Sequence, residues 1–258
     1  MRVGRRKFED RHGRIKTMSS NEKTYDRVLA VGDIHGCLTP FLSMYKKIAV
    51  TDDDLIIFLG DYIDRGPESL SALEWIGREA LKPNVIALRG NHEQTLLDCI
   101  AGRFANRFYG SGIGTLREVR EAAKTDPTLP LRIVQTIRRM PLYHRMTLNG
   151  REHIFCHAGV DALKDPNPLI ETQEADRIVW VREEFYRHYE GEAIYVVGHT
   201  PVQFLGQPPV PIKHFDGRNI WLMDTGSCCV DSGRISCVDL LSEKIWQTDR
   251  IGTGSMGF

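Results

Sequence analysis

Short apolar runs alternate with longer stretches of helical periodicity through the first third of the chain. Each apolar run holds four or five residues and is rich in β-branched types, which is typical of a buried strand. Repeated strand–helix–strand units favour a parallel sheet with helices packed on it. The pattern predicts strands over Val28–Val31, Leu55–Leu59 and Val85–Leu88, and helices over Pro40–Ile48, Glu68–Leu81 and Glu93–Ile100.

The rest of the chain is less regular. Residues 101–151 indicate mostly helix, with Gly110–Gly114 as a loop or hinge. Strand signals then return, and short turns such as Asp231–Arg234 favour antiparallel hairpins. We therefore expect an α/β fold of two packed mixed β-sheets flanked by helices. The later strands are predicted over His153–Cys156, Ala193–Val197, Ile220–Met223, Ile235–Leu240 and Lys244–Gln247.

Composition narrows the class of protein. With 258 residues, 41% hydrophobic and 26% charged, the chain has the make-up of a soluble globular protein. Its 34 basic and 34 acidic residues balance, so no overall basic field for nucleic acid is expected. No apolar run is long enough for a membrane span, and no secretory signal is visible, which predicts a cytoplasmic protein. The six cysteines contain no CxxC pair, so neither a zinc knuckle nor a dithiol redox motif is indicated.

Although the total charge is balanced, the N-terminal segment is basic. Residues 1–24 hold eight basic and three acidic residues, a net charge of +5, and very few apolar residues. A segment of this kind cannot bury enough apolar surface to order itself, so we expect a disordered arm. Residues 25–258 are predicted to form a single domain.

Five of the predicted strands end in side chains that can bind metal ions. In four cases a glycine separates the strand from that side chain, which permits a sharp exit and a close approach of the backbone. Loops at the carboxyl ends of parallel strands gather at one edge of a sheet. Six oxygen and imidazole ligands without a thiolate suit two Mn, Fe or Zn ions that share a carboxylate. The candidate ligands are Asp33, His35, Asp61, Asn91, His157 and His199.

These motifs resemble those of the calcineurin-like metallophosphoesterases, and within them the phosphoprotein phosphatase branch with its bacteriophage and bacterial members. The resemblance extends from about Arg27 to Asp239. It is carried by Gly32-Asp-Ile-His35, Gly60-Asp61, Asp64-Arg-Gly66, Gly90-Asn-His-Glu93, His157 and Gly198-His-Thr200.

The resemblance implies a dinuclear centre. Asp61 would bridge the two ions, with manganese the expected metal and iron or zinc the alternatives. A hydroxide between the ions would be the nucleophile. One ion would be held by Asp33, His35 and Asp61, and the other by Asp61, Asn91, His157 and His199.

The resemblance also implies roles around the substrate. Arg65, Arg89 and Arg182 match phosphate-binding arginines, whose planar forks suit phosphate oxygens. His92 would be the general acid that protonates the leaving oxygen, oriented by Asp64.

Three functions remain open from the sequence. The leading hypothesis is a protein phosphatase acting on phosphoserine and phosphothreonine, with phosphotyrosine as an extension. The main alternative is a symmetrical dinucleoside-tetraphosphate hydrolase, which typically lacks an acid at the position of Asp64 and has Asp where Glu93 stands. A catalytically silent scaffold would not need the complete ligand set. The expected partners are phosphoproteins or small phosphorylated molecules, with no nucleic acid and no membrane.

Overall fold

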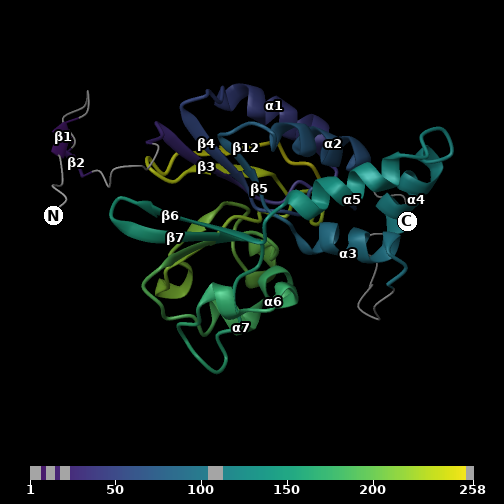
Figure 1. The fold of residues 1–258 in the computed structure, drawn as a ribbon. Helices are drawn as coiled ribbons and strands as arrows, with labels where there is room; N and C mark the ends of the chain where they lie inside the picture. Colours follow the sequence, from purple (N-terminus) through teal and green to yellow (C-terminus); the bar gives the residue numbers. More distant parts are fainter. Residues whose placement is uncertain (1–6, 10–14, 18–23, 104–112, 254–258) are drawn as a thin grey trace, which may run out of the picture.

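The computed structural model describes residues 7–9, 15–17, 24–103 and 113–253 (Figure 1). Its main body contains two five-stranded sheets with the strand orders β12-β11-β3-β4-β5 and β6-β7-β8-β10-β9. Within the described residues, no helix is long and apolar enough to cross a lipid bilayer.

The first sheet contains the predicted parallel unit. Strands β3, β4 and β5 run parallel, and helices α1 and α2 make the two crossovers between them. Two further strands from the end of the chain, β11 and β12, extend the sheet in antiparallel fashion beside β3. The bounds are β3 Arg27–Val31, α1 Leu38–Ile48, β4 Asp54–Phe58, α2 Ser69–Glu79, β5 Val85–Ala87, α3 Asn91–Ile100, β11 Ser236–Asp239 and β12 Ile245–Gln247.

The second sheet is mixed. Strands β7, β8 and β10 are parallel, whereas β6 and β9 pair antiparallel at the two edges. Short helices line the connections on its outer face (Figure 1). The bounds are β6 Tyr143–Leu148, β7 Arg151–Cys156, α6 Ala175–Trp180, α7 Glu183–Tyr186, β8 Ile194–Val197, β9 Ile212–Lys213 and β10 Ile220–Leu222, with 3₁₀ turns at Ile170–Thr172, Val202–Leu205 and Phe215–Gly217.

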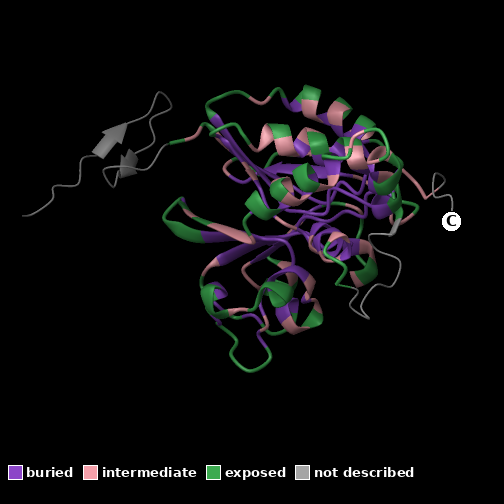
Figure 2. Ribbon diagram, turned by 45° about the vertical axis from the view of Figure 1, so that its right-hand side comes forward, coloured by how far each residue is buried: buried purple, intermediate pink, exposed green. Residues whose placement is uncertain are grey.

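Alternating side chains of the strands build separate cores on the two faces of each sheet. In β3, Val28 and Ala30 pack between the sheets, while Leu29 and Val31 pack against the first helical layer. Strand β8 divides in the same way, since Val196 faces the other sheet. Figure 2 shows the buried residues concentrated along these layers. The predicted fold of two packed mixed sheets flanked by helices is confirmed.

The middle of the chain differs in part from the prediction. Residues 101–151 do contain two helices, α4 (Ile113–Ala122) and α5 (Leu129–Arg139), but they also contain strand β6. This strand lies at a sheet edge and buries only Leu148 fully, so its sequence lacks the alternating apolar pattern that predicts a strand. The predicted loop at Gly110–Gly114 is wrong at its end, because α4 includes Ile113 and Gly114, and its remainder lies outside the described residues.

The hairpin predicted around Asp231–Arg234 is also wrong. The strands on either side of this turn, β10 and β11, belong to different sheets, so the chain crosses between the layers there. Turn residues mark where the chain reverses, but not which strand becomes the partner. The consecutive strands that pair antiparallel in the second half are instead β6–β7, β9–β10 and β11–β12.

The N-terminal arm is described at two short segments. Strands β1 (Lys7–Glu9) and β2 (Ile15–Thr17) pair antiparallel with each other. The other residues before Thr24 lie outside the described part of the chain, so disorder of this arm stays a prediction.

A partly buried ion pair links the start of β4 to β3 and should contribute to stability. Asp54 is 1% exposed, and Arg27 donates hydrogen bonds to its carboxylate over 2.8 and 2.6 Å. Burial would raise the pKa of Asp54, but the hydrogen bonds from Arg27 and Thr51 hold it below its ordinary value. We expect Asp54→Asn to lower the free energy of unfolding at pH 7 by about 2–3 kcal/mol in urea titrations, somewhat less than for a fully buried pair.

The pH dependence follows from the lowered pKa. The contribution of the Asp54 carboxylate is present above its unfolded pKa of about 3.9 and is lost as the pH falls through the folded value. The variant and the wild type should therefore converge in strongly acidic solution. The exposed pair Lys124–Glu121 is the control, since Lys124→Ala should change stability by less than about 0.5 kcal/mol. Equal stabilities at pH 7 would contradict the assignment to Asp54.

Candidate metal centre

The loops that follow β3, β4, β5, β7 and β8 meet at one edge of the two sheets. Within the first sheet, the backbone N–H groups of Ile34 and His35 both donate to the carbonyl of Asp61. Across the sheets, the N–H of His199 donates to Asp33 Oδ1 over 3.1 Å. The structure thus brings together all six ligands predicted from the sequence, and each is at most 5% exposed.

Two glycines leave room for the carboxylates of the cluster. A Cβ atom at Gly198 would lie 2.2 Å from Asp33 Oδ1, and one at Gly90 would lie 2.2 Å from Asp61 Oδ1. A side chain at either position would therefore force the carboxylate to move. These glycines are therefore required by the close approach of backbone and ligand, as expected at the strand ends.

Several residues of the site have a left-handed backbone, which is unfavourable for any residue except glycine. The φ angles are +49° at His35, +55° at Asp61 and +68° at His199. Each such residue costs on the order of 1 kcal/mol or more and persists only where surrounding contacts impose it. The sharp turns aim the side chains at a common point rather than along the strands.

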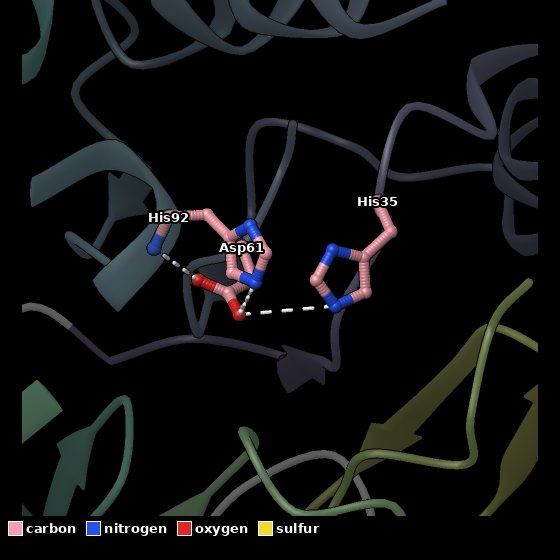
Figure 3. Close-up of side chains that lie close together, drawn as sticks. All are labelled: His35, Asp61 and His92. Carbon is pink, nitrogen blue, oxygen red and sulfur yellow. Dashed lines mark hydrogen bonds and ion pairs between the residues drawn. The ribbon is translucent and has the colours of Figure 1, made fainter. Parts of the chain in front are cut away.

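Asp61 lies at the centre of the cluster. Its Oδ2 atom is 3.3 Å from His157 Nε2, 3.7 Å from His92 Nε2 and 3.8 Å from His35 Nε2. Figure 3 shows the rings of His35 and His92 on two sides of this carboxylate. Two groups of side chains that could hold a metal ion share Asp61: one also contains His35 and His92, and the other contains His157 and His199.

Second hydrogen bonds orient two of the histidines toward the cluster. His35 Nδ1 lies 3.0 Å from the carbonyl oxygen of Ile63, and His157 Nδ1 lies 2.9 Å from that of Leu59. A carbonyl can only accept, so Nδ1 carries the proton in both rings. Nε2 is therefore the ring atom that faces the cluster in both histidines, and a metal ion would replace any proton on it, as in metal-binding histidines.

The remaining predicted ligands complete the donor set. His199 Nε2 is buried and has no hydrogen-bond partner among the described residues. Asn91 Oδ1 lies 2.9 Å from His157 Nε2, and Asp33 Oδ2 lies 3.7 Å from His35 Nε2. A set of imidazole nitrogens, carboxylates and an amide oxygen without thiolate suits manganese, iron or zinc. The residues present therefore fit divalent metal ions.

The pKa shifts within the cluster are also consistent with binding of a cation. Burial would raise the pKa of Asp61, but the imidazoles of His157, His92 and His35 hold it well below its ordinary value. Burial opposes protonation of His157, yet Asp61 raises the pKa of that imidazole to about 9. Burial and the nearby carboxylate of Asp224 raise the pKa of Asp33 well above its usual range. A bound cation would relieve this crowding of buried carboxylates.

His92 has its own carboxylate partner. Its Nδ1 atom lies 2.6 Å from Asp64 Oδ2, and both residues are buried. Burial would lower the pKa of His92, but Asp61 and Asp64 raise it above the ordinary value. Because Asp64 accepts the Nδ1 proton, Nε2 is the ring atom directed at the cluster. This geometry suits a proton donor, although the position of Nε2 is also within the reach of a metal ion.

Comparison with known proteins decides the family. A model of the calcineurin-like phosphoesterases matches residues 26–234, which is most of the chain. The chain belongs to this family. Among curated relatives, serine/threonine-protein phosphatase 2 of Salmonella typhimurium is 27% identical over 86% of this chain and 96% of its own length.

Other relatives of the phosphoesterase are nucleotide hydrolases. Bis(5′-nucleosyl)-tetraphosphatase PrpE (asymmetrical) of Anoxybacillus flavithermus is 27% identical over 67% of this chain and 78% of its own length. A solved structure of a diadenosine tetraphosphatase candidate matches with a TM-score of 0.61 and 18% identity, over 86% of this chain and 92% of that one. The family relationship and the fold are thus shown, whereas the relatives divide between two substrates.

Two of the three predicted arginines adjoin the cluster in the phosphoesterase. Arg65 Nη1 lies 3.0 Å from His35 Nε2, and Arg182 Nη1 donates to the carbonyl oxygen of His199 over 3.1 Å. Arg89 points elsewhere, since its guanidinium bonds Gln94 and the carbonyl oxygen of Met140 at the end of α5. Phosphate binding by Arg89 stays a prediction, and it requires these hydrogen bonds to be exchanged.

Sequence reasoning assigned no role to three buried residues near the centre. Glu93 accepts backbone N–H groups of Asp61, Tyr62 and Gly90, and so holds the loop of the central carboxylate against α3. Asp224 follows β10, and the strand-end rule would have found it. Its Oδ2 has no hydrogen-bond partner among the described atoms, and burial raises its pKa to about 6. Thr115 had no signal, because it lies in α4 outside every motif.

Proposed function

We propose that this phosphoesterase is a metal-dependent phosphomonoesterase that removes phosphate from serine and threonine side chains of proteins. The hydrogen bond of His92 Nδ1 to Asp64 Oδ2 carries the proposal, because a ring held in this orientation beside Asp61 suits the role of a proton donor. The alkoxide of serine or threonine is a poor leaving group, so its departure needs protonation. A general acid typically contributes about 10²–10⁴-fold to such a reaction.

Each group of residues would have a separate role in hydrolysis of the phosphate ester. The cluster around Asp61 would hold two divalent ions, which would supply a nucleophile at neutral pH and neutralise charge on the phosphate oxygens. Arg65 and Arg182 would bind the phosphoryl oxygens and orient the ester. As the ester P–O bond breaks, His92 Nε2 gives its proton to the departing oxygen. Asp64 keeps the ring in the required tautomer and stabilises its charge.

A second candidate is hydrolysis of a dinucleoside tetraphosphate. It is favoured by the similarity to PrpE, which is named for asymmetrical cleavage, whereas the sequence suggested symmetrical cleavage as the alternative. The leaving group in that reaction is a nucleotide phosphate, which departs without a proton. The His92–Asp64 pair has less to contribute there, so this reaction ranks second.

Parallel assays with Mn²⁺ separate these candidates. We expect kcat/KM for a phosphoserine or phosphothreonine peptide to exceed that for diadenosine tetraphosphate by about tenfold or more. The opposite order would establish the nucleotide hydrolase, and its products would identify the mode: two ADP for symmetrical cleavage, ATP and AMP for asymmetrical. A phosphotyrosine peptide tests dual specificity. Failure to hydrolyse even p-nitrophenyl phosphate, with or without Mn²⁺, would favour the scaffold.

A further inference from the structure

Thr115, in the first turn of α4, contacts the carboxylate that orients His92. Its side chain is completely buried, and its Oγ1 hydroxyl donates to Asp64 Oδ1 over 2.5 Å. The backbone N–H of Thr115 points at the same oxygen from 3.4 Å. The other oxygen, Oδ2, bonds His92 Nδ1. The two carboxylate oxygens thus have different partners, one on α4 and one on α3.

The contact is not a routine helix bond. In the first turn of α4, Thr115 has no preceding turn of the same helix whose carbonyl could accept from its hydroxyl. Thr115 instead bonds a side chain 51 positions away, in the loop after β4. A buried hydroxyl needs a partner, but that need alone does not select a carboxylate already bonded to His92.

Helix α2 contacts both Asp64 and helix α4, and so fixes their relative position. The backbone N–H of Asp64 donates to Ser69 Oγ over 2.9 Å, at the start of α2. One residue further on, the N–H of Leu70 donates to Glu118 Oε2 of α4 over 3.2 Å. Asp64 and α4 are therefore attached to the same turn of α2. Asp64 has a left-handed backbone with φ of +68°, so its position depends on such contacts.

We propose that Thr115 is a positioning residue for proton donation by His92, an inference that rests on the proposed function. The torsion between Cβ and the carboxylate of an aspartate is soft, so one hydrogen bond does not fix the plane of the group. By engaging Oδ1, Thr115 sets that plane, so that Oδ2 stays in line with His92 Nδ1. The ring then presents Nε2 to the leaving oxygen in one orientation, which matters because small displacements of a catalytic group are costly.

The test compares Thr115→Val, which keeps the shape and removes the hydroxyl, with Thr115→Ser, which keeps the hydroxyl. For a phosphoserine peptide, we expect Thr115→Val to lower kcat about tenfold with KM unchanged, a fraction of the full contribution of a general acid. For p-nitrophenyl phosphate, whose leaving group needs little protonation, the loss should stay below about threefold. Thr115→Ser should restore most of the lost rate. Thr125→Val, at an exposed position just beyond α4, is the matched control.

A double-mutant cycle excludes a merely structural role. If Thr115 acts through His92, Thr115→Val should have no further effect in a His92→Ala background. Equal losses on both substrates, an additive effect in that background, or a reduced Mn²⁺ content would overturn the inference. An unchanged ratio of the two substrates in Thr115→Val would do the same.

A readout without substrate keeps the inference separate from the proposed function. The proton resonance of His92 Nδ1–H in the Mg²⁺-loaded protein reports its bond to Asp64 directly. We expect Thr115→Val to broaden it through faster exchange with water, and Thr115→Ser to preserve it. A resonance that is the same in Thr115→Val as in the wild type overturns the inference, whichever phosphate compound proves to be the substrate. Failure of the wild type on phosphopeptides, with this resonance sensitive to Thr115, would overturn only the proposed function.

Discussion

Asp61→Asn is expected to abolish tight binding of Mn²⁺ and to lower turnover of phosphate esters by about 10³-fold or more, since a metal centre supplies several kcal/mol of transition-state stabilisation. The replacement has the same shape and can still accept the N–H of His92 at Oδ1, which lies 3.0 Å away. It replaces Oδ2, the atom that faces three imidazoles, with an NH₂ group that cannot bind a cation. Because both candidate groups share Asp61, both ions should be lost.

Metal content per chain, measured after dialysis against buffered Mn²⁺, checks this prediction. Asp33→Asn and His157→Asn each affect one side of the cluster, and each should weaken the binding of one ion more than the other. Asp52→Asn makes the same chemical change at an exposed site and should keep both metal and turnover. Two retained ions and full activity in Asp61→Asn would remove the basis of the proposed centre.

His92→Ala should separate substrates by their leaving groups. For a phosphoserine peptide we expect kcat to fall by about 10²–10⁴-fold, the usual contribution of a general acid. For p-nitrophenyl phosphate the loss should stay below about tenfold, because the departing phenolate is stable without a proton. The measurement is kcat for both esters with Mn²⁺ at saturation. His188→Ala, on the surface, is the matched control.

Metal content decides between the two roles that the geometry allows His92. As an acid, His92 is dispensable for the ions, so His92→Ala should bind as much Mn²⁺ as the wild type. As a ligand beside His35 and Asp61, its loss should reduce the metal content and slow both esters equally. The second pattern would assign His92 to the metal and leave the reaction without its proposed proton donor.

The ion pair of Arg27 with Asp54 and the hydrogen bond of Thr115 to Asp64 cannot be predicted from local sequence, because each joins residues on different elements. Arg27 and Asp54 stand at the starts of two strands whose apolar patterns were clear, yet nothing in either pattern joins them. Their ion pair exists because β3 and β4 align Arg27 opposite Asp54. Register between strands is a property of the assembled sheet.

The sequence by itself determined the strands of the first sheet, the two-sheet class and the six candidate ligands, because these depend on local signals. Apolar periodicity identifies buried strands, and a glycine followed by Asp, His or Asn identifies where a strand ends at a site. Edge strand β6, with little buried surface, lacked such a signal.

Tertiary structure alone decided the rest. It placed Arg89 against the end of α5, sent the chain across the sheets between β10 and β11, and joined Thr115 to Asp64. A hydrogen bond between residues 51 positions apart leaves no trace in local composition, because its donor and acceptor become neighbours only when helices and sheets pack. The residue types needed for the chemistry can therefore be read along the chain, whereas the contacts that orient them arise from packing.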